Sequence, residues 1–194
     1  MRYLKKSAHS QVISNQLQYP KDAKRIRDEL LKEQIGFCAY SERYVQNTDA
    51  VDVEHFDARL KGTENDSYWN WYAVLSWMNK RKPRKIEPFE PILQPYSEDI
   101  NRRIKYENGQ FLAVDPNDKE ADNLIKYLGW NSPELYEDRR KHIDRIRFVQ
   151  KACGDDQESF FNYLVNHPDN LSFFSALRVE LGLPETLIER VNKS

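Results

Sequence analysis

Cysteine is scarce in this sequence, since only Cys38 and Cys153 occur among 194 residues. Two cysteines cannot build the disulfide framework of a small secreted protein, so we expect a reduced, cytoplasmic protein. The sequence also lacks any apolar run near the roughly 20 residues that span a bilayer. No apolar stretch follows the basic N-terminus, as it would in a signal peptide. We therefore expect no membrane partner.

An excess of one charge is also absent, with 30 Lys and Arg against 31 Asp and Glu. Overall charge thus neither favours nor excludes a nucleic-acid partner, and only local clustering is informative. Six glycines and nine prolines exclude a fibrous or low-complexity protein. What the chain does contain is 12% aromatic residues, enough to fill a core. Its length indicates one domain, or a small core with a helical appendage.

Hydrophobic periodicity gives a first outline of the N-terminal half. It predicts a helix over 21–34, a short strand over 37–40 and a second strand that ends at His55. A polar loop over 57–67 follows, and then an apolar stretch from Tyr68 to about Lys80, predicted as a helix that Pro83 stops. Residues 37–82 are therefore expected to run strand, strand, loop, helix.

Stronger local signals mark the second half. Asn108-Gly109 lies between two apolar segments, and this pair is typical of a two-residue hairpin turn. An amphipathic helix is expected over 118–128, and Ser132-Pro133 forms a good start for a long helix to Cys153. Two more helices are expected over 160–165 and 171–181. The predicted fold class is α+β: a small core within a mostly helical protein, with one additional hairpin.

Four polar residues carry the chemical signal: Glu54 and His55 in one strand, then Asn70 and Asn79. Hydrolysis of a phosphodiester needs a base to activate water, and often a divalent metal to stabilise developing charge. A histidine at a strand end can supply the base. Carboxylate and amide oxygens suit Mg²⁺, which keeps several of its waters and needs few protein ligands.

At this spacing the residues resemble the HNH endonucleases, also called ββα-metal or His-Me finger nucleases. The wider chain resembles the retron- and Septu-associated branch of that family, the PtuB-like nucleases of phage defence. The resemblance covers roughly residues 1–150 and includes the segment 33–42 and the strand 53–56. It implies a ββα-metal core within residues 36–85.

The resemblance assigns a role to each residue of the constellation. His55 would be the general base. Asn70, counted with it as catalytic, would hold the backbone of the loop after His55. Glu54 and Asn79 would bind one divalent ion, Mg²⁺ or Mn²⁺.

The chain departs from that branch at its zinc site, where members commonly carry two Cys-x-x-Cys pairs. Here the first pair reads Cys38 to Ser41, and Leu75 and Met78 stand at the second. Three of four thiolates are missing, so no structural zinc is expected. An apolar contact is expected to replace the clamp.

Basic residues cluster beside the proposed site. One interpretation is a solvated cluster that complements a helix C-terminus. The other is phosphate binding, which we expect of seven residues: Arg59, Lys61, Lys80, Arg81, Lys82, Arg84 and Lys85.

Four segments are expected: 1–35, helical; 36–85, the nuclease core; 86–154, a hairpin and helices on the core; 155–194, helical. The phenylalanines of the last segment fit either a helical core or a docking surface for a partner.

The function predicted is a metal-dependent endonuclease that cuts nucleic acid, with DNA favoured over RNA, as the effector of an anti-phage system. The resemblance implies an ATPase subunit of the SMC/ABC-like type as partner. Two alternatives stay open: a catalytically weakened subunit that binds nucleic acid or the ATPase without cutting, and a ribonuclease acting on RNA such as tRNA.

Overall fold

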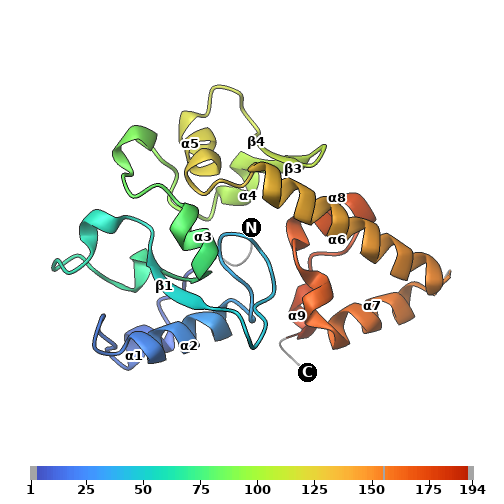
Figure 1. The fold of residues 1–194 in the computed structure, drawn as a ribbon, viewed down its shortest axis with the longest axis horizontal. Coiled ribbons are helices and arrows are strands. Elements are labelled where there is room, and N and C mark those ends of the chain that lie inside the picture. The colour runs from blue at the N-terminus through green and yellow to red at the C-terminus, as the bar shows by residue number, and fades with distance from the viewer. Residues whose placement is uncertain (1–3, 155, 192–194) are drawn as a thin grey trace.

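The computed structural model describes residues 4–154 and 156–191. Helices alternate with two separate antiparallel strand pairs, which agrees with the predicted α+β class. Residues 1–3, at the start of the basic N-terminus for which no signal peptide is expected, lie outside the described part. So do residues 155 and 192–194 of the last predicted segment. In Figure 1 the first strand pair lies with α1 and α2 at one end of the molecule, and the C-terminal helices lie at the other.

The first strand pair joins β1 (Val51–His55) to β2 (Trp71–Leu75). The pairing is antiparallel, with Val51 opposite Leu75 and His55 opposite Trp71. Helix α3 (Ser76–Arg81) follows β2 directly and packs against both strands. The chain thus forms two strands and a short helix, with His55 at the end of the first strand.

The helix predicted over Tyr68 to Lys80 is wrong in its first half. That stretch is a 3₁₀ turn over Tyr68–Asn70, then β2, and only then α3. All five residues of β2 are buried, because Trp71 and Ala73 face one apolar cluster while Tyr72 and Val74 face another. A strand buried on both faces reads as a continuous apolar run, and periodicity cannot distinguish such a run from a buried helix.

The short strand predicted over 37–40 is also wrong, since this segment has an isolated bridge between Phe37 and Tyr44 and one backbone bond to β2, from the Ala39 amide to the Ala73 carbonyl oxygen at 3.1 Å. The amide side chain of Gln34 occupies the neighbouring edge of β2. Its Oε1 accepts from the Ala73 amide at 2.9 Å, and its Nε2 donates to the carbonyl oxygens of Ala73 and Phe37. The side chain therefore takes hydrogen bonds that a third strand would have made.

The N-terminal helices cover one face of the first strand pair. Helix α1 (Gln11–Ser14) packs on α2 (Ala23–Glu33), and α2 contacts both strands. The helix predicted over 21–34 is confirmed. Ile26 and Leu30 of α2 are buried with Trp71 and Ala73 in a small apolar cluster, which fixes α2 beside the end of β1.

The second strand pair confirms the predicted hairpin, with β3 (Ile104–Glu107) antiparallel to β4 (Gln110–Ala113). A one-turn helix, α4 (Ile100–Arg103), precedes it. Asn108 and Gly109 have φ of 50° and 82°, as the two-residue turn requires. Helix α5 (Lys119–Tyr127) follows and confirms the amphipathic helix expected over 118–128.

The long helix expected to begin at Pro133 is α6 (Pro133–Ala152), and the Ser132 side chain accepts from the Leu135 amide as its N-cap. After it come α7 (Gln157–Asn166), α8 (Phe174–Leu181) and a short helix that was not predicted, α9 (Leu187–Val191). Phe160, Phe173 and Phe174 are buried in the main core, so these side chains favour a helical core over a docking surface.

Cys38, Leu75 and Met78 share that main core. The Leu75 amide donates to Cys38 Sγ at 3.4 Å, so these positions meet through apolar packing and one weak hydrogen bond. Within the described ranges, no helix combines the length and apolar character needed to cross a membrane.

Candidate active site

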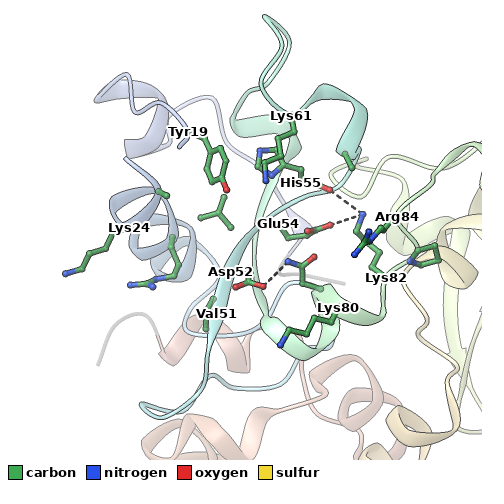
Figure 2. A pocket seen from close by; sticks show the side chains of 16 residues that line it. Tyr19, Lys24, Val51, Asp52, Glu54, His55, Lys61, Lys80, Lys82 and Arg84 are labelled. Atoms are coloured by element: carbon green, nitrogen blue, oxygen red, sulfur yellow. Dashed lines mark hydrogen bonds and ion pairs between the residues drawn. The ribbon is translucent and has the colours of Figure 1, made fainter. Parts of the chain in front are cut away.

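A pocket of about 870 Å³ opens along β1, between the N-terminal part of α2 and the C-terminal end of α3. Figure 2 shows β1 crossing the pocket, with Lys24 on the α2 side and Lys80, Lys82 and Arg84 on the α3 side. Glu54, His55 and Asn79 all line it, so the structure brings three members of the predicted constellation together. The fourth, Asn70, is not part of the pocket lining and binds the backbone of Asp57.

His55 is held at the end of β1 by an acidic partner and an aromatic wall. Its Nε2 lies 3.2 Å from one carboxylate oxygen of Asp66 and 3.3 Å from the other. The Tyr19 ring packs edge-on against the imidazole, with 4.7 Å between ring centroids. A carboxylate only accepts hydrogen bonds, so Asp66 places the imidazole proton on Nε2 and leaves the lone pair on Nδ1.

Asp66 is itself fixed in position. It accepts from the Gly62 amide at 2.8 Å and from the indole N–H of Trp71, and its side chain is only 6% exposed. A carboxylate fixed beside an imidazole in this way keeps the imidazole in a single tautomer.

Burial lowers the pKa of His55 below its ordinary value of 6.5, and the Lys61 charge acts in the same direction, while Asp66 opposes both. The imidazole is therefore neutral at neutral pH. A neutral histidine with a free Nδ1 lone pair can accept a proton from water or a hydroxyl group.

Asn70 occupies the position predicted for it. Its Oδ1 accepts from the Asp57 amide at 2.8 Å, and its Nδ2 donates to the Asp57 carbonyl oxygen at 3.0 Å. The side chain is buried and binds both backbone groups of a residue two positions after His55. It thus fixes the chain where β1 ends.

Glu54 is buried, and its carboxylate is ion-paired with Lys82, with 2.8 Å between Oε1 and Nζ. Burial raises the pKa of Glu54, and the Lys82 charge opposes the rise. Asn79 makes a separate contact, because its Nδ2 donates to Asp52 at 2.8 Å. The two predicted metal ligands therefore line one pocket, but each is engaged by another side chain of the protein (Figure 2).

Oxygen donors of Glu54, Asn79 and Asp52 match the chemistry of Mg²⁺ or Mn²⁺. The arrangement of Glu54 does not, because an ammonium group already lies at its carboxylate. Across residues 4–154 and 156–191, no group of three or more His, Cys, Asp or Glu side chains gathers in a way that could hold a metal ion. The residues as arranged do not fit a divalent ion at Glu54, and that ion remains a prediction.

The seven basic residues predicted to bind nucleic acid divide into two groups. Lys61, Lys80, Lys82 and Arg84 line the pocket. The other three lie outside its lining: Arg59 pairs with Asp57 and Glu90, Arg81 pairs with Glu134, and Lys85 is exposed.

Sequence reasoning missed several residues of the site. Asp52 lies two residues before Glu54 and so points to the same face of β1, a signal that strand alternation could have supplied. Lys24 and Arg27 lie in the first half of α2, and both line the pocket and add positive charge to it. Asp66 gave no signal, since its role depends on the packing of the loop before β2. The same holds for Tyr127 at the end of α5, whose hydroxyl accepts from Lys82 Nζ at 2.6 Å.

Comparison of the chain with models of protein families, with curated proteins and with solved structures finds no match. The functional proposal below therefore depends on the residues of the site.

Proposed function

We propose that this chain is an HNH-type endonuclease that hydrolyses phosphodiester bonds of nucleic acid, with His55 as the general base. The observation that carries the proposal is the His55–Asp66 pair at the end of β1, inside a pocket lined by cationic side chains. A neutral imidazole beside a polyanion site is the combination that this hydrolysis needs.

The basic lining supports a nucleic-acid substrate. Five cationic residues besides Lys82 surround the pocket and come from three different segments: Lys24, Arg27, Lys61, Lys80 and Arg84. Phosphates of a polynucleotide would be held on both sides of β1 while one phosphorus lies near His55. Such binding is electrostatic and independent of base sequence.

In the proposed mechanism, His55 Nδ1 accepts a proton from the attacking water, and Asp66 stabilises the imidazolium that forms. The P–O bond to the leaving oxygen breaks as the water oxygen attacks phosphorus from the opposite side. The leaving oxygen takes a proton from solvent water, and the His55 imidazolium then releases its proton to solvent. Asn70 fixes the loop that positions His55.

The resemblance favours DNA over RNA and adds an ATPase subunit as partner, so the experiment includes both. Supercoiled plasmid, linear DNA and tRNA are incubated with the purified chain, alone and with an ATPase subunit of the SMC/ABC-like type. Each reaction is run with Mg²⁺, with Mn²⁺ and with a chelator.

We expect cleavage by the wild-type chain and a loss of about 10²–10⁴-fold in His55→Ala, the usual contribution of a general base. His9→Ala is the matched control, because His9 is exposed and lies outside the pocket. Equal cleavage by His55→Ala and the wild type would contradict the proposal. Tight binding without cleavage in every reaction would instead support the alternative of a subunit that binds without cutting.

A further inference from the structure

Lys82 is the C-cap residue of α3, yet its side chain is only 5% exposed. A lysine at the end of a surface helix normally extends its ammonium group into water. Here the stem runs inward instead, and the ammonium lies next to β1, in the lining of the pocket (Figure 2).

Four oxygen atoms surround that ammonium group. Nζ lies 2.8 Å from Glu54 Oε1 and donates to the Tyr127 hydroxyl at 2.6 Å. It also donates to the carbonyl oxygens of Phe56 and His55, at 3.1 and 3.3 Å. The set comprises one carboxylate, one hydroxyl and two carbonyls, and these are the donor types that a hard cation takes in proteins.

The ammonium group and its four oxygen neighbours come from three parts of the fold. β1 and the residue after it supply Glu54 and the two carbonyls, α3 supplies the lysine, and α5 supplies Tyr127. Tyr127 is fully buried, and its hydroxyl also bonds to the Phe56 carbonyl oxygen at 3.0 Å. Because the ammonium contacts the carbonyl of His55 itself, the cation is adjacent to the general base.

A buried carboxylate needs a compensating positive charge. Lys82 supplies one for Glu54, and a divalent ion bound to the same oxygen would have to displace an ammonium that makes this ion pair and donates three hydrogen bonds. Displacement would leave the lysine without its buried partners, which is costly.

We propose that Lys82 is a built-in cation that holds, at Glu54, the place of a divalent metal ion. The ammonium neutralises the carboxylate, fixes the backbone at the end of β1 and presents positive charge to the pocket beside His55. The idea that this positive charge attracts a phosphate group rests on the proposed function. Occupancy of the Glu54 site by Lys82 does not.

The test is Mn²⁺ binding, measured from the signal of free Mn²⁺ in electron paramagnetic resonance. It compares the wild type, Glu54→Gln, Lys82→Ala and the double variant. The wild type should bind no Mn²⁺ that depends on Glu54. Lys82→Ala should gain a Mn²⁺ site, since it leaves a carboxylate among oxygen donors, and adding Glu54→Gln should remove that site.

Mn²⁺ binding by the wild type that Glu54→Gln abolishes would overturn the proposal, and so would failure of folded Lys82→Ala to gain a site. Circular dichroism checks the fold of each variant. If Lys82→Ala does not fold, Lys82→Met replaces it, because methionine keeps an unbranched stem. The comparison of Mn²⁺ binding between the wild type and Glu54→Gln needs no Lys82 variant and tests the proposal by itself. No arm needs cleavage, so this proposal and the nuclease can fail separately.

Discussion

The Nε2 atom of His55 lies 3.2 Å from a carboxylate oxygen of Asp66, which the loop before β2 brings back to the end of β1. The aspartate holds the imidazole proton on Nε2, which leaves Nδ1 free, and its negative charge affects the pKa of the ring. Burial lowers the pKa of His55, the aspartate raises it, and the Lys61 charge lowers it. The net result is a pKa below 6.5.

Replacing Asp66 by Asn should therefore lower the pKa of His55 further, because the substitution removes a charge that favours the imidazolium. The measurement is an NMR titration of the His55 ring protons, which needs no enzymatic activity. Glu64→Gln is the matched control, since Glu64 is an exposed carboxylate in the same loop. A rise in the His55 pKa, or an equal fall in Glu64→Gln, would contradict the geometry described for this pair.

Loss of the Asn70 side chain should destabilise the end of β1. Asn70→Ala leaves the amide and carbonyl of Asp57 without their partner, and buried groups left unpaired in this way cost about 1–3 kcal/mol. The free energy of unfolding in urea measures the loss. Asn65→Ala, at an exposed position of the preceding loop, should change it by no more than about 0.5 kcal/mol. Equal effects of the two substitutions would rule out the anchoring role.

Removal of positive charge from both sides of the pocket should weaken nucleic-acid binding and its dependence on salt. Lys24 and Lys80 line the pocket from α2 and α3. If each contacts one phosphate of duplex DNA, the double alanine variant should lower the slope of log K against log salt by about 2. Fluorescence anisotropy at several salt concentrations measures that slope.

The control for this prediction is Lys141→Ala with Lys151→Ala, two exposed positions on α6 outside the pocket lining. It removes the same net charge from a different part of the surface. A slope that falls equally in both double variants would show that overall charge, and not the pocket, determines binding.

His142 should make the stability of the protein depend on pH. Its Nε2 lies 3.0 Å from the Asn170 carbonyl oxygen, and burial lowers its pKa from 6.5 to about 4. Between these values the unfolded chain binds the proton and the folded chain does not, so stability falls as the pH drops from 6.5 towards 4. The contribution at pH 5 relative to pH 7 is about 1–2 kcal/mol.

Urea unfolding of the wild type and of His142→Gln at pH 7 and pH 5 tests this prediction. The wild type should lose more stability than the variant, because glutamine does not titrate. His9→Gln serves as control at an exposed histidine. An equal loss in the wild type and in His142→Gln would mean that His142 is not protonated differently in the two states.

Local signals were sufficient for much of the fold. Three features depend only on backbone conformation and on residues within one or two turns: the Asn108-Gly109 turn, the helix start at Ser132-Pro133, and the apolar face of α2. The same holds for the placement of His55 at a strand end. Interactions of this kind are encoded in a short window, so they can be read from the sequence.

The strand β2 could not be read in that way. Its five residues are apolar because α2 and the main core cover opposite faces, and nothing within the strand distinguishes that situation from a buried helix. The segment 37–40 failed for a related reason. At the edge of β2, Ala73 bonds to the side chain of Gln34 as well as to the Ala39 amide, and a short window of sequence does not show such a side-chain contact.

The sequence by itself determined which polar residues are available for chemistry and placed His55 at the end of a strand. Only the tertiary structure decided what each of them contacts: Asp66 for His55, Asp52 for Asn79, and Lys82 with Tyr127 around Glu54. The physical reason is that hydrogen bonds and ion pairs between side chains form across elements far apart in the chain. Residue 127 meets residue 82 only because α5 packs where α3 ends.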